Sequence, residues 1–377
     1  MFYAARRRIP CISGIMVFER YFKDYLKEFD QLYPEVWAYK DGCVMTGAQI
    51  LYEAEKDDRY LQSLLCFGDK YVREDGSVTG FRPSEHNVDQ LRCGTTFFFL
   101  YDQTGNEKYK KAMELFMDNL KTFPRTEEGS FWHKEIYPYQ VWLDGLYMAM
   151  PFYLKYDTLY GGKKHYNDII DQFKRVRRYQ YDEEKQLYYH AYDEKRKMIW
   201  ADKETGLSPC FWLRAEGWFL MALVDCYEII PEESYDQFRY LGALYKEALG
   251  GILKYQDQES GLFYQLIDRA DLPGNYLETS GSAMVAYSIL KACRLGLLQR
   301  EKYFEVGEQI LTALETKMFS VENKKFHLNG ICASAGLGPK DERDGSPEYY
   351  LNEPQKQDNK HGAAACMMAY GEWKRQI

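Results

Sequence analysis

Six segments of the chain share one unusual pattern: each is apolar on nearly every face of a helix and carries a glycine near its start. The segments are TGAQILYEA from Thr46, RCGTTFFFLY from Arg92, LDGLYMAMPFYL from Leu143, AEGWFLMALVDCY from Ala215, SGSAMVAYSILKACRLG from Ser280 and HGAAACMMAYGEW from His361. The glycines are Gly47, Gly94, Gly145, Gly217, Gly281 and Gly362. A helix that is apolar all round belongs in the interior of a protein. The pattern therefore predicts six buried helices.

A second kind of helix, amphipathic and charged, follows each of the first five segments after a turn. Examples are DDRYLQSLLCFGDKYV from Asp57, NEKYKKAMELFMDNLK from Asn106 and KKHYNDIIDQFKRVRRY from Lys163. A sixth fits VFERYFKDYLKEF, from Val17 to Phe29. Six buried helices alternating with six surface helices predict a closed all-α ring, an inner barrel within an outer one. An open α-solenoid is the competing interpretation, but it would need more uniform repeats and polar caps.

Charge and hydropathy exclude two classes of partner. The chain has 377 residues and a formal net charge of −8, whereas a phosphate backbone is bound by clustered Lys and Arg. We therefore expect no nucleic-acid partner. No stretch of about twenty apolar residues is present, so we expect no membrane span. Because no low-complexity linker interrupts the chain, residues 16–377 are expected to form a single domain.

The first residues and the cysteines bear on the cellular compartment. A basic triplet, Arg6 to Arg8, precedes a short apolar run that resembles a signal peptide. Pro10 interrupts this run and no small-residue cleavage site follows, so we expect residues 1–15 to be a disordered leader, with Met16 as an alternative start. Nine cysteines without a C-x-x-C pair match neither a disulfide framework nor a zinc site. They indicate reduced thiols in a cytoplasmic protein without metal or cofactor.

Polar and aromatic residues gather around the starts of the buried helices. In a closed ring these helices run the same way, so their N-termini meet at one mouth. The residues are Trp37, Tyr39, Lys40, His86, Asp89, Trp132, His133, Lys134, Trp142, Asp144, His190, Trp200, Trp212, Arg214, Trp218, Glu278, Asp344, Tyr349, Tyr350 and Lys360. Long insertions on one face of a repeat architecture usually build a binding site. Aromatic faces beside polar groups suit sugar rings, and helix N-termini favour an anionic ligand.

Asp144 is the strongest candidate for an acid at this mouth. Held between Trp142 and the inner barrel, its carboxyl would lose hydration, which raises the pKa, and a nearby Asp89 would raise that pKa further by repulsion. Each feature also has a structural alternative. The aspartates could cap their helices, the tryptophans could pack the core, the histidines could be structural imidazoles, and Arg214 could brace a loop through backbone carbonyls.

Four segments carry a resemblance to a known family. They are FWHKEIYPYQVWLDGLYM at 131–148, YYHAYDEKRKMIWADKETGLSPCFWLRAEGW at 188–218, LETSGSAM at 277–284 and RDGSPEYYLNEP at 343–354. Together they resemble glycoside hydrolase family 105, the unsaturated rhamnogalacturonyl hydrolases, which are related to the family 88 unsaturated glucuronyl hydrolases. The resemblance extends over nearly the whole chain from about Phe29 onward. It implies an (α/α)6 barrel, in agreement with the helix pattern.

The resemblance also implies a reaction. Such enzymes act on a small oligosaccharide ending in a 4,5-unsaturated uronic acid, the product left by pectin lyases, and hydrate its C4=C5 bond. An acid protonates C4, water adds at C5, and the hemiketal opens and releases the next sugar. The family's catalytic aspartate, in the WLDG motif, corresponds to Asp144, and a second aspartate corresponds to Asp89. The subsite for the unsaturated sugar would contain His133, His190, Trp212, Arg214 and Trp218. We further expect Trp37, Tyr39, Lys40, Lys134 and Trp142 to contact substrate.

Other functions remain compatible with such a ring. An inverting glycosidase could use the same mouth, and so could a polysaccharide lyase, which needs a Tyr or His base and a cation that neutralises the uronate. A non-enzymatic scaffold or sugar-binding module is the third alternative. Leu213 and Glu216 stand where the family commonly has Gly and Met, which bears on substrate preference more than on the reaction.

Overall fold

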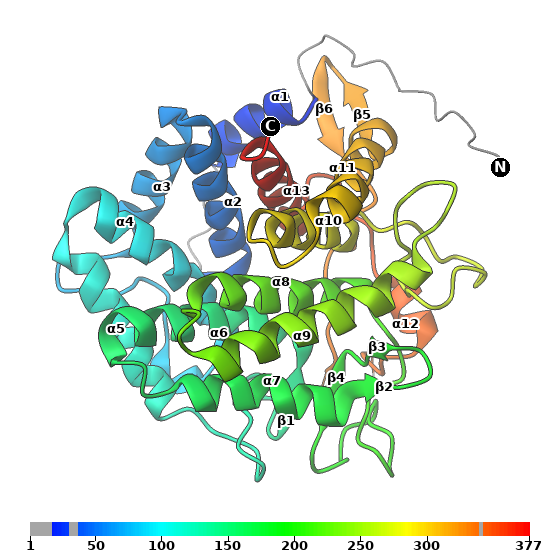
Figure 1. The fold of residues 1–377 in the computed structure, drawn as a ribbon, viewed down its shortest axis with the longest axis horizontal. Helices are drawn as coiled ribbons and strands as arrows, with labels where there is room; N and C mark the ends of the chain where they lie inside the picture. Colours follow the sequence, from blue (N-terminus) through cyan, green and yellow to red (C-terminus); the bar gives the residue numbers. More distant parts are fainter. Residues whose placement is uncertain (1–16, 30–36, 339–341) are drawn as a thin grey trace.

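The computed structural model describes residues 17–29, 37–338 and 342–377, which fold into two concentric rings of helices (Figure 1). The inner ring consists of α2 (Tyr39–Glu55), the 3₁₀ helix η2 (Val88–Thr96) continued by α4 (Phe97–Thr104), α6 (Leu143–Tyr156), α8 (Leu213–Ile229), α10 (Thr279–Arg294) and α13 (Lys360–Lys374). The outer ring consists of α1 (Val17–Phe29), α3 (Asp58–Tyr71), α5 (Glu107–Lys121), α7 (Tyr166–Gln180), α9 (Tyr235–Ile252) and α11 (Arg300–Lys317). The expected leader, residues 1–15, and Met16 lie outside the described residues.

The inner ring is closed. Helix α2 packs on η2, η2 on α6, α6 on α8, α8 on α10 and α10 on α13, and α13 packs back on α2. The last of these contacts distinguishes a ring from a solenoid, because a solenoid leaves its first and last repeats apart. The predicted all-α (α/α)6 barrel is confirmed, and the open solenoid is wrong.

The glycines of the buried segments lie where inner helices touch. A Cβ atom on Gly47 of α2 would lie 2.7 Å from the Cβ of Met367 on α13. A Cβ on Gly217 of α8 would lie 2.8 Å from the sulfur of Met284 on α10. Such distances are too short for real side-chain contacts, so these positions need a residue without a side chain. The repeated glycine thus reflects close helix packing.

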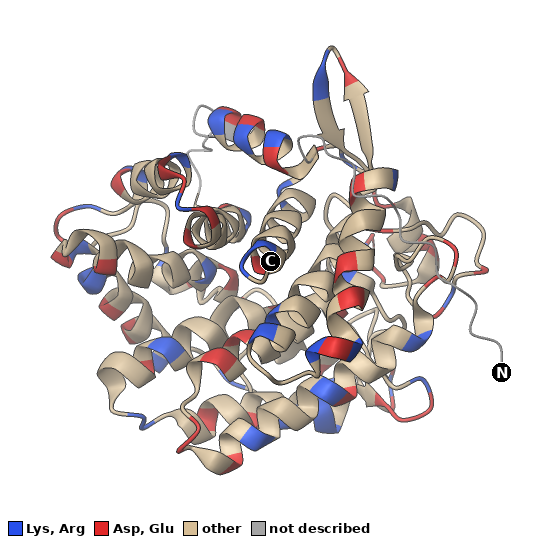
Figure 2. Cartoon of the chain, turned by 45° about the horizontal axis from the view of Figure 1, so that its top comes forward, with Lys and Arg blue, Asp and Glu red and all other residues tan. Residues whose placement is uncertain are grey.

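Burial follows the two kinds of helix. Every residue of α10 from Thr279 to Cys293 is buried, whereas α7 buries Ile169, Phe173 and Val176 and turns its charges outward. Figure 2 shows the charged residues concentrated on the outer helices and loops, with the inner helices mostly uncharged. This distribution is the one predicted from the apolar and the amphipathic segments.

The second inner helix differs from the prediction. The sequence predicts an α-helix from Arg92, but the segment begins at Val88 as a 3₁₀ helix and becomes α-helical only at Phe97. The side chain of Asn87 accepts a hydrogen bond from the backbone N–H of Asp89, and this cap fixes the earlier start.

Smaller elements lie in the connections. They are the helix α12 (Pro347–Asn352), the short turns η1 (Pro83–Glu85), η3 (Asp157–Gly161) and η4 (Leu253–Tyr255), and three antiparallel pairs: β1 (Gln140–Trp142) with β4 (Ala191–Asp193), β2 (Tyr181–Asp182) with β3 (Leu187–Tyr188), and β5 (Phe319–Glu322) with β6 (Lys325–Leu328). In the part of the chain that the structure describes, no helix is long and apolar enough to cross a membrane.

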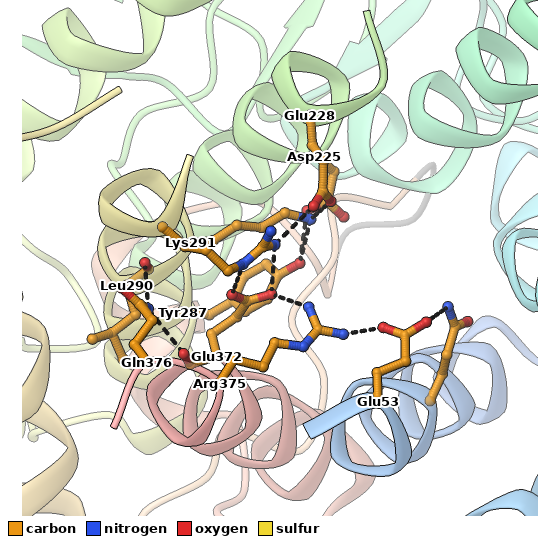
Figure 3. A network of polar contacts seen from close by, with 11 residues as sticks. Glu53, Asp225, Glu228, Tyr287, Leu290, Lys291, Glu372, Arg375 and Gln376 are labelled. Carbon is orange, nitrogen blue, oxygen red and sulfur yellow. Dashed lines mark hydrogen bonds and ion pairs between the residues drawn. The ribbon is translucent and has the colours of Figure 1, made fainter. Parts of the chain in front are cut away.

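A partly buried ionic network joins inner helices at the end of the ring where they finish (Figure 3). Lys291 of α10 lies between two acids of α8, with its Nζ 2.8 Å from Asp225 and 2.7 Å from Glu228. The Tyr287 hydroxyl also donates to Asp225, at 2.7 Å. Burial alone would raise the pKa of Glu228, but Lys291 and Arg294 lower it to about 2.

The same network continues to the first and last inner helices. Arg294 of α10 donates to Glu372 of α13 at 2.7 Å, and Arg375, just beyond α13, pairs with both Glu372 and Glu53 of α2. Buried charges are tolerated only when they are paired. The network therefore favours one arrangement of α8, α10, α13 and α2.

Candidate active site

All six inner helices begin at the same end of the ring, and each places a polar side chain in or just before its first turn. The side chains are Tyr39 on α2, Asp89 on η2, Asp144 on α6, Arg214 on α8, Glu278 before α10 and His361 on α13. The Tyr39 hydroxyl lies 2.7 Å from Nε2 of His361. Nη1 of Arg214 lies 3.8 Å from Oε1 of Glu278.

Tyr39 shows that these groups are close together. Burial raises the pKa of Tyr39 well above its ordinary value, and the negative charges of Asp89 and Asp144 raise it further, while Arg214 opposes the rise. One hydroxyl thus lies within electrostatic reach of side chains from η2, α6 and α8. The mouth predicted from the sequence brings both aspartates and the arginine together.

Asp144 is the second residue of α6, directly after strand β1. Pairing of β1 with β4 sets Trp142 opposite Ala191, next to His190 in the chain. This register brings Oδ2 of Asp144 to 3.2 Å from Nε2 of His190, an ion-pair distance. His190 is fully buried, and neither of these two atoms has a hydrogen-bond partner among the described residues.

The expectation that Asp144 has a raised pKa is wrong. Burial does raise the pKa of this carboxyl, but His190 and, more weakly, His133 lower it by more, so that it lies below its ordinary value. The sequence argument counted the apolar flank of Asp144 and missed the imidazole beside it. In the free protein the group is a carboxylate at neutral pH.

Asp89 is compensated by a cation. Its carboxylate lies 2.7 Å from Nζ of Lys134 and 3.6 Å from Nε2 of His133. The positive charge of Lys134 therefore offsets the negative charge with which Asp89 was expected to repel Asp144. Neither aspartate caps its helix, because the N-cap residues are Asn87 for η2 and Trp142 for α6. The capping alternative is wrong for both.

Trp142 lies in a stack of parallel rings. Its ring centroid is 4.5 Å from that of His133 and 5.1 Å from that of Tyr137. Its indole N–H donates to the side chain of Gln140 at 3.0 Å. Burial lowers the pKa of His133 to about 4, although Asp89 opposes the shift. His133 is therefore neutral at physiological pH and can act as a hydrogen-bond donor or acceptor without carrying charge.

Trp212 and Arg214 form the opposite wall. The guanidinium carbon of Arg214 lies 4.6 Å from the centroid of the Trp212 ring, a cation–π contact. Nη1 of Arg214 donates to the carbonyl of Cys332 at 2.7 Å and to Ser280 Oγ at 3.1 Å. Arg214 thus holds the loop at Cys332 in place, as the structural alternative for this residue predicted. Its Nε–H remains without a hydrogen-bond partner among the described residues.

The model of Glycosyl Hydrolase Family 88 matches residues 18–377. The chain belongs to this family.

The chain is also similar to several known proteins. A family 105 glycoside hydrolase from C. acetobutylicum is 37% identical, with a TM-score of 0.88 over 94% of this chain and 99% of that one. Protein Atu3128 of Agrobacterium fabrum is 42% identical over 231 residues, which are 60% of this chain and 97% of that protein. The unsaturated rhamnogalacturonyl hydrolase YesR of Bacillus subtilis is 28% identical over 265 residues, 69% of this chain and 72% of YesR.

Three further residues of the predicted site have different surroundings. Trp37 is buried among aromatic rings of the core and its indole N–H donates to the carbonyl of Gln90 at 2.8 Å, so the expected substrate contact is wrong. Trp218 lies a turn deeper in α8 than Arg214 and stacks on Tyr147, with ring centroids 4.9 Å apart. Lys40 lies within electrostatic reach of Arg214.

Lys40 and Lys360 line the same cavity. It has a volume of about 480 Å³ and is also lined by Tyr21 and Tyr25 of α1. Burial lowers the pKa of Lys40, and the positive charges of Arg214 and Lys360 lower it further.

Sequence reasoning placed Glu278 and Tyr350 at the mouth without giving either a role, and it missed His361. Glu278 is fully buried and accepts hydrogen bonds from Ser280 Oγ, from Gly281 N at 2.7 Å and from Cys332 N at 3.1 Å. His361 contacts Tyr39, and Tyr350 contacts His190, as described below. His361 could have been found from its place at the start of an inner helix, the same place that drew attention to Asp144.

Proposed function

We propose that this glycoside hydrolase removes a 4,5-unsaturated uronic acid from the non-reducing end of rhamnogalacturonan oligosaccharides by hydrating the C4=C5 double bond. The observation that carries the proposal is a partly buried carboxylate, Asp144, set 3.2 Å from His190 at a mouth that also holds Arg214. An anion-binding arginine beside a proton-transferring carboxyl is what an unsaturated uronate requires. The likeness to YesR supports rhamnogalacturonan as the source of the substrate.

In this proposal Asp144 handles both protons of the reaction. Binding of the uronate expels water and brings a second negative charge, which raises the pKa of Asp144 so that it arrives at C4 protonated. The acid gives its proton to C4, and the resulting carboxylate takes a proton from the water that adds at C5. The C5 hemiketal then opens and the next sugar leaves from C1. One water is consumed, and Asp144 ends in the protonation state in which it began.

The other members of the site hold the sugar. Arg214 pairs with the uronate through its guanidinium. Asp89 and Lys134, 2.7 Å apart, offer an acceptor and a donor for hydroxyl groups. His133 and Trp142, stacked together, form one wall, and Trp212 supports Arg214 from the other side. These roles match the residue types that recognise a charged sugar.

A panel of unsaturated disaccharides tests the proposal through the absorbance of the C4=C5 chromophore. We expect disaccharides from rhamnogalacturonan to lose this absorbance, with rhamnose released. A lyase would create the absorbance from saturated polysaccharide, and a sugar-binding scaffold would leave it unchanged. Turnover confined to unsaturated glucuronides of another glycan would keep the reaction and overturn the rhamnogalacturonan assignment.

We also propose that the protein acts in the cytoplasm. Seven of the described cysteines are buried and have free thiols. Free thiols are typical of a reducing compartment. Mass spectrometry of the protein from its native cells should find these cysteines unpaired, and disulfides between them would contradict the proposal.

A further inference from the structure

His190 is held from both sides. Its Nε2 lies 3.2 Å from Oδ2 of Asp144, and its Nδ1 lies 2.6 Å from the hydroxyl of Tyr350. Both His190 and Tyr350 are fully buried. Tyr350, His190 and Asp144 thus form a line of three groups that ends at the carboxyl to which the proposed function gives the proton transfers.

The position of the imidazole proton follows from these contacts. A neutral imidazole carries one N–H and one lone pair. A proton on Nδ1 would leave the lone pair of Nε2 facing the Asp144 carboxylate, which is repulsive. A proton on Nε2 points at the carboxylate and leaves Nδ1 free to accept from Tyr350. Because Nε2 has no hydrogen-bond partner among the described residues, no other contact competes for its proton.

The surroundings of Tyr350 make its hydroxyl the donor in the hydrogen bond with Nδ1 of His190. Burial raises the pKa of its phenol well above the ordinary value, so the hydroxyl keeps its proton. The side chain comes from α12, whose start is capped by Ser346 through a hydrogen bond from the Tyr349 N–H at 3.1 Å. The ring of Tyr350 lies 5.9 Å from that of Trp212. Helix α12, in the long connection before α13, therefore places the Tyr350 hydroxyl beside Nδ1 of His190.

We propose that Tyr350 is a positioning residue that donates its hydroxyl proton to Nδ1 of His190 and so fixes the imidazole N–H on Nε2, aimed at Asp144. The assignment of a catalytic benefit rests on the proposed function, whereas the tautomer itself does not. The charged and titratable groups that face this pair are Asp144 of α6, His133 before β1, Arg214 of α8, Tyr349 of α12 and the thiols of Cys210 and Cys332.

The first measurement is the tautomer of His190. The chain has six histidines, so ¹⁵N-histidine labelling gives few signals, and the one lost in His190→Gln belongs to His190. We expect the wild type at neutral pH to show a protonated Nε2 and an unprotonated Nδ1. Tyr350→Phe should show a mixture of the two tautomers. A proton on Nδ1 in the wild type, or an unchanged pattern in Tyr350→Phe, would overturn the proposal.

The second measurement is the pH profile of turnover with an unsaturated disaccharide. Tyr349→Phe is the matched control, because the Tyr349 hydroxyl bonds the backbone of Gly336 rather than His190, accepting from the N–H at 3.0 Å and donating to the carbonyl at 2.8 Å. Tyr350→Phe should lower kcat by about tenfold or more, as expected when a catalytic histidine loses its tautomer, with KM little changed. Its profile should also move to higher pH, because Asp144 loses the N–H that lowers its pKa.

The two measurements separate failure of this proposal from failure of the proposed function. If the wild type turns over no unsaturated uronide, the proposed function fails, and the tautomer measurement still decides the role of Tyr350. If the wild type is active and Tyr350→Phe follows the wild-type pH profile, as Tyr349→Phe should, Tyr350 only fills space.

Discussion

Replacing Asp144 by asparagine is expected to lower turnover at least about a hundredfold while the protein stays folded. Asparagine has the size of aspartate but no acidic proton to give to C4. The fold should tolerate it because Asp144 does not cap α6. The amide oxygen can also face Nε2 of His190, which lies 3.2 Å from Oδ2 in the wild type. The measurement is the pH profile of turnover for both proteins, together with their thermal melts.

A buried aspartate at the other end of the ring supplies the control. Asp225→Asn weakens the pairing of Lys291, which lies 2.8 Å from Asp225. It should lower the melting temperature and leave turnover per folded molecule unchanged. Wild-type turnover in Asp144→Asn, or its failure to fold, would show that the proton donor is another group, with Asp89 the next candidate.

The melts also have a defined pH dependence. Folding lowers the pKa of Asp144, so its ionisation stabilises the folded state above the unfolded value of about 3.9. This contribution is lost as the pH falls through the lower, folded value. The difference in stability between the wild type and Asp144→Asn should therefore shift in favour of the variant as the solution becomes acidic.

Arg214→Ala is expected to cost about 2–4 kcal/mol of transition-state binding, seen as a fall in kcat/KM. The guanidinium is the group that we expect to pair with the uronate. Arg214→Lys should recover little, because a point charge does not reproduce a planar fork. The structure adds a second effect of the alanine variant: it loses the hydrogen bond to the carbonyl of Cys332 at 2.7 Å, so it should also melt earlier.

A neighbouring variant separates the two effects. Ser280→Ala removes a hydrogen bond to Arg214, 3.1 Å long, and leaves the guanidinium in place. It should lower the melting temperature slightly with kcat/KM nearly unchanged. If Arg214→Ala melts earlier but turns over substrate at the normal rate, the arginine serves only as a brace for the loop at Cys332.

The sequence was sufficient for the features that depend on local periodicity. The apolar and amphipathic segments predict the two rings because helix period and burial are read from neighbours in the chain. The chemistry of Asp144 was mispredicted because its closest charged neighbour, His190, reaches it only through the pairing of β1 with β4. The same holds for Arg214, whose brace at Cys332 lies 118 residues away. Trp37 was misplaced because a tryptophan before a helix has the same local pattern whether it faces the core or the mouth.

Closure of the inner ring by α13 has a consequence for the synthesis of the protein. Lys360 at the start of α13 pairs with Asp41 at the start of α2, across 319 residues of chain. At about 5–20 residues per second a ribosome needs on the order of tens of seconds to make that stretch. Until α13 emerges, α2 has no neighbour on one side, and its apolar flank is open to other nascent chains. The barrel can therefore close only once α13 has been made, and the apolar flank of α2 stays uncovered until then.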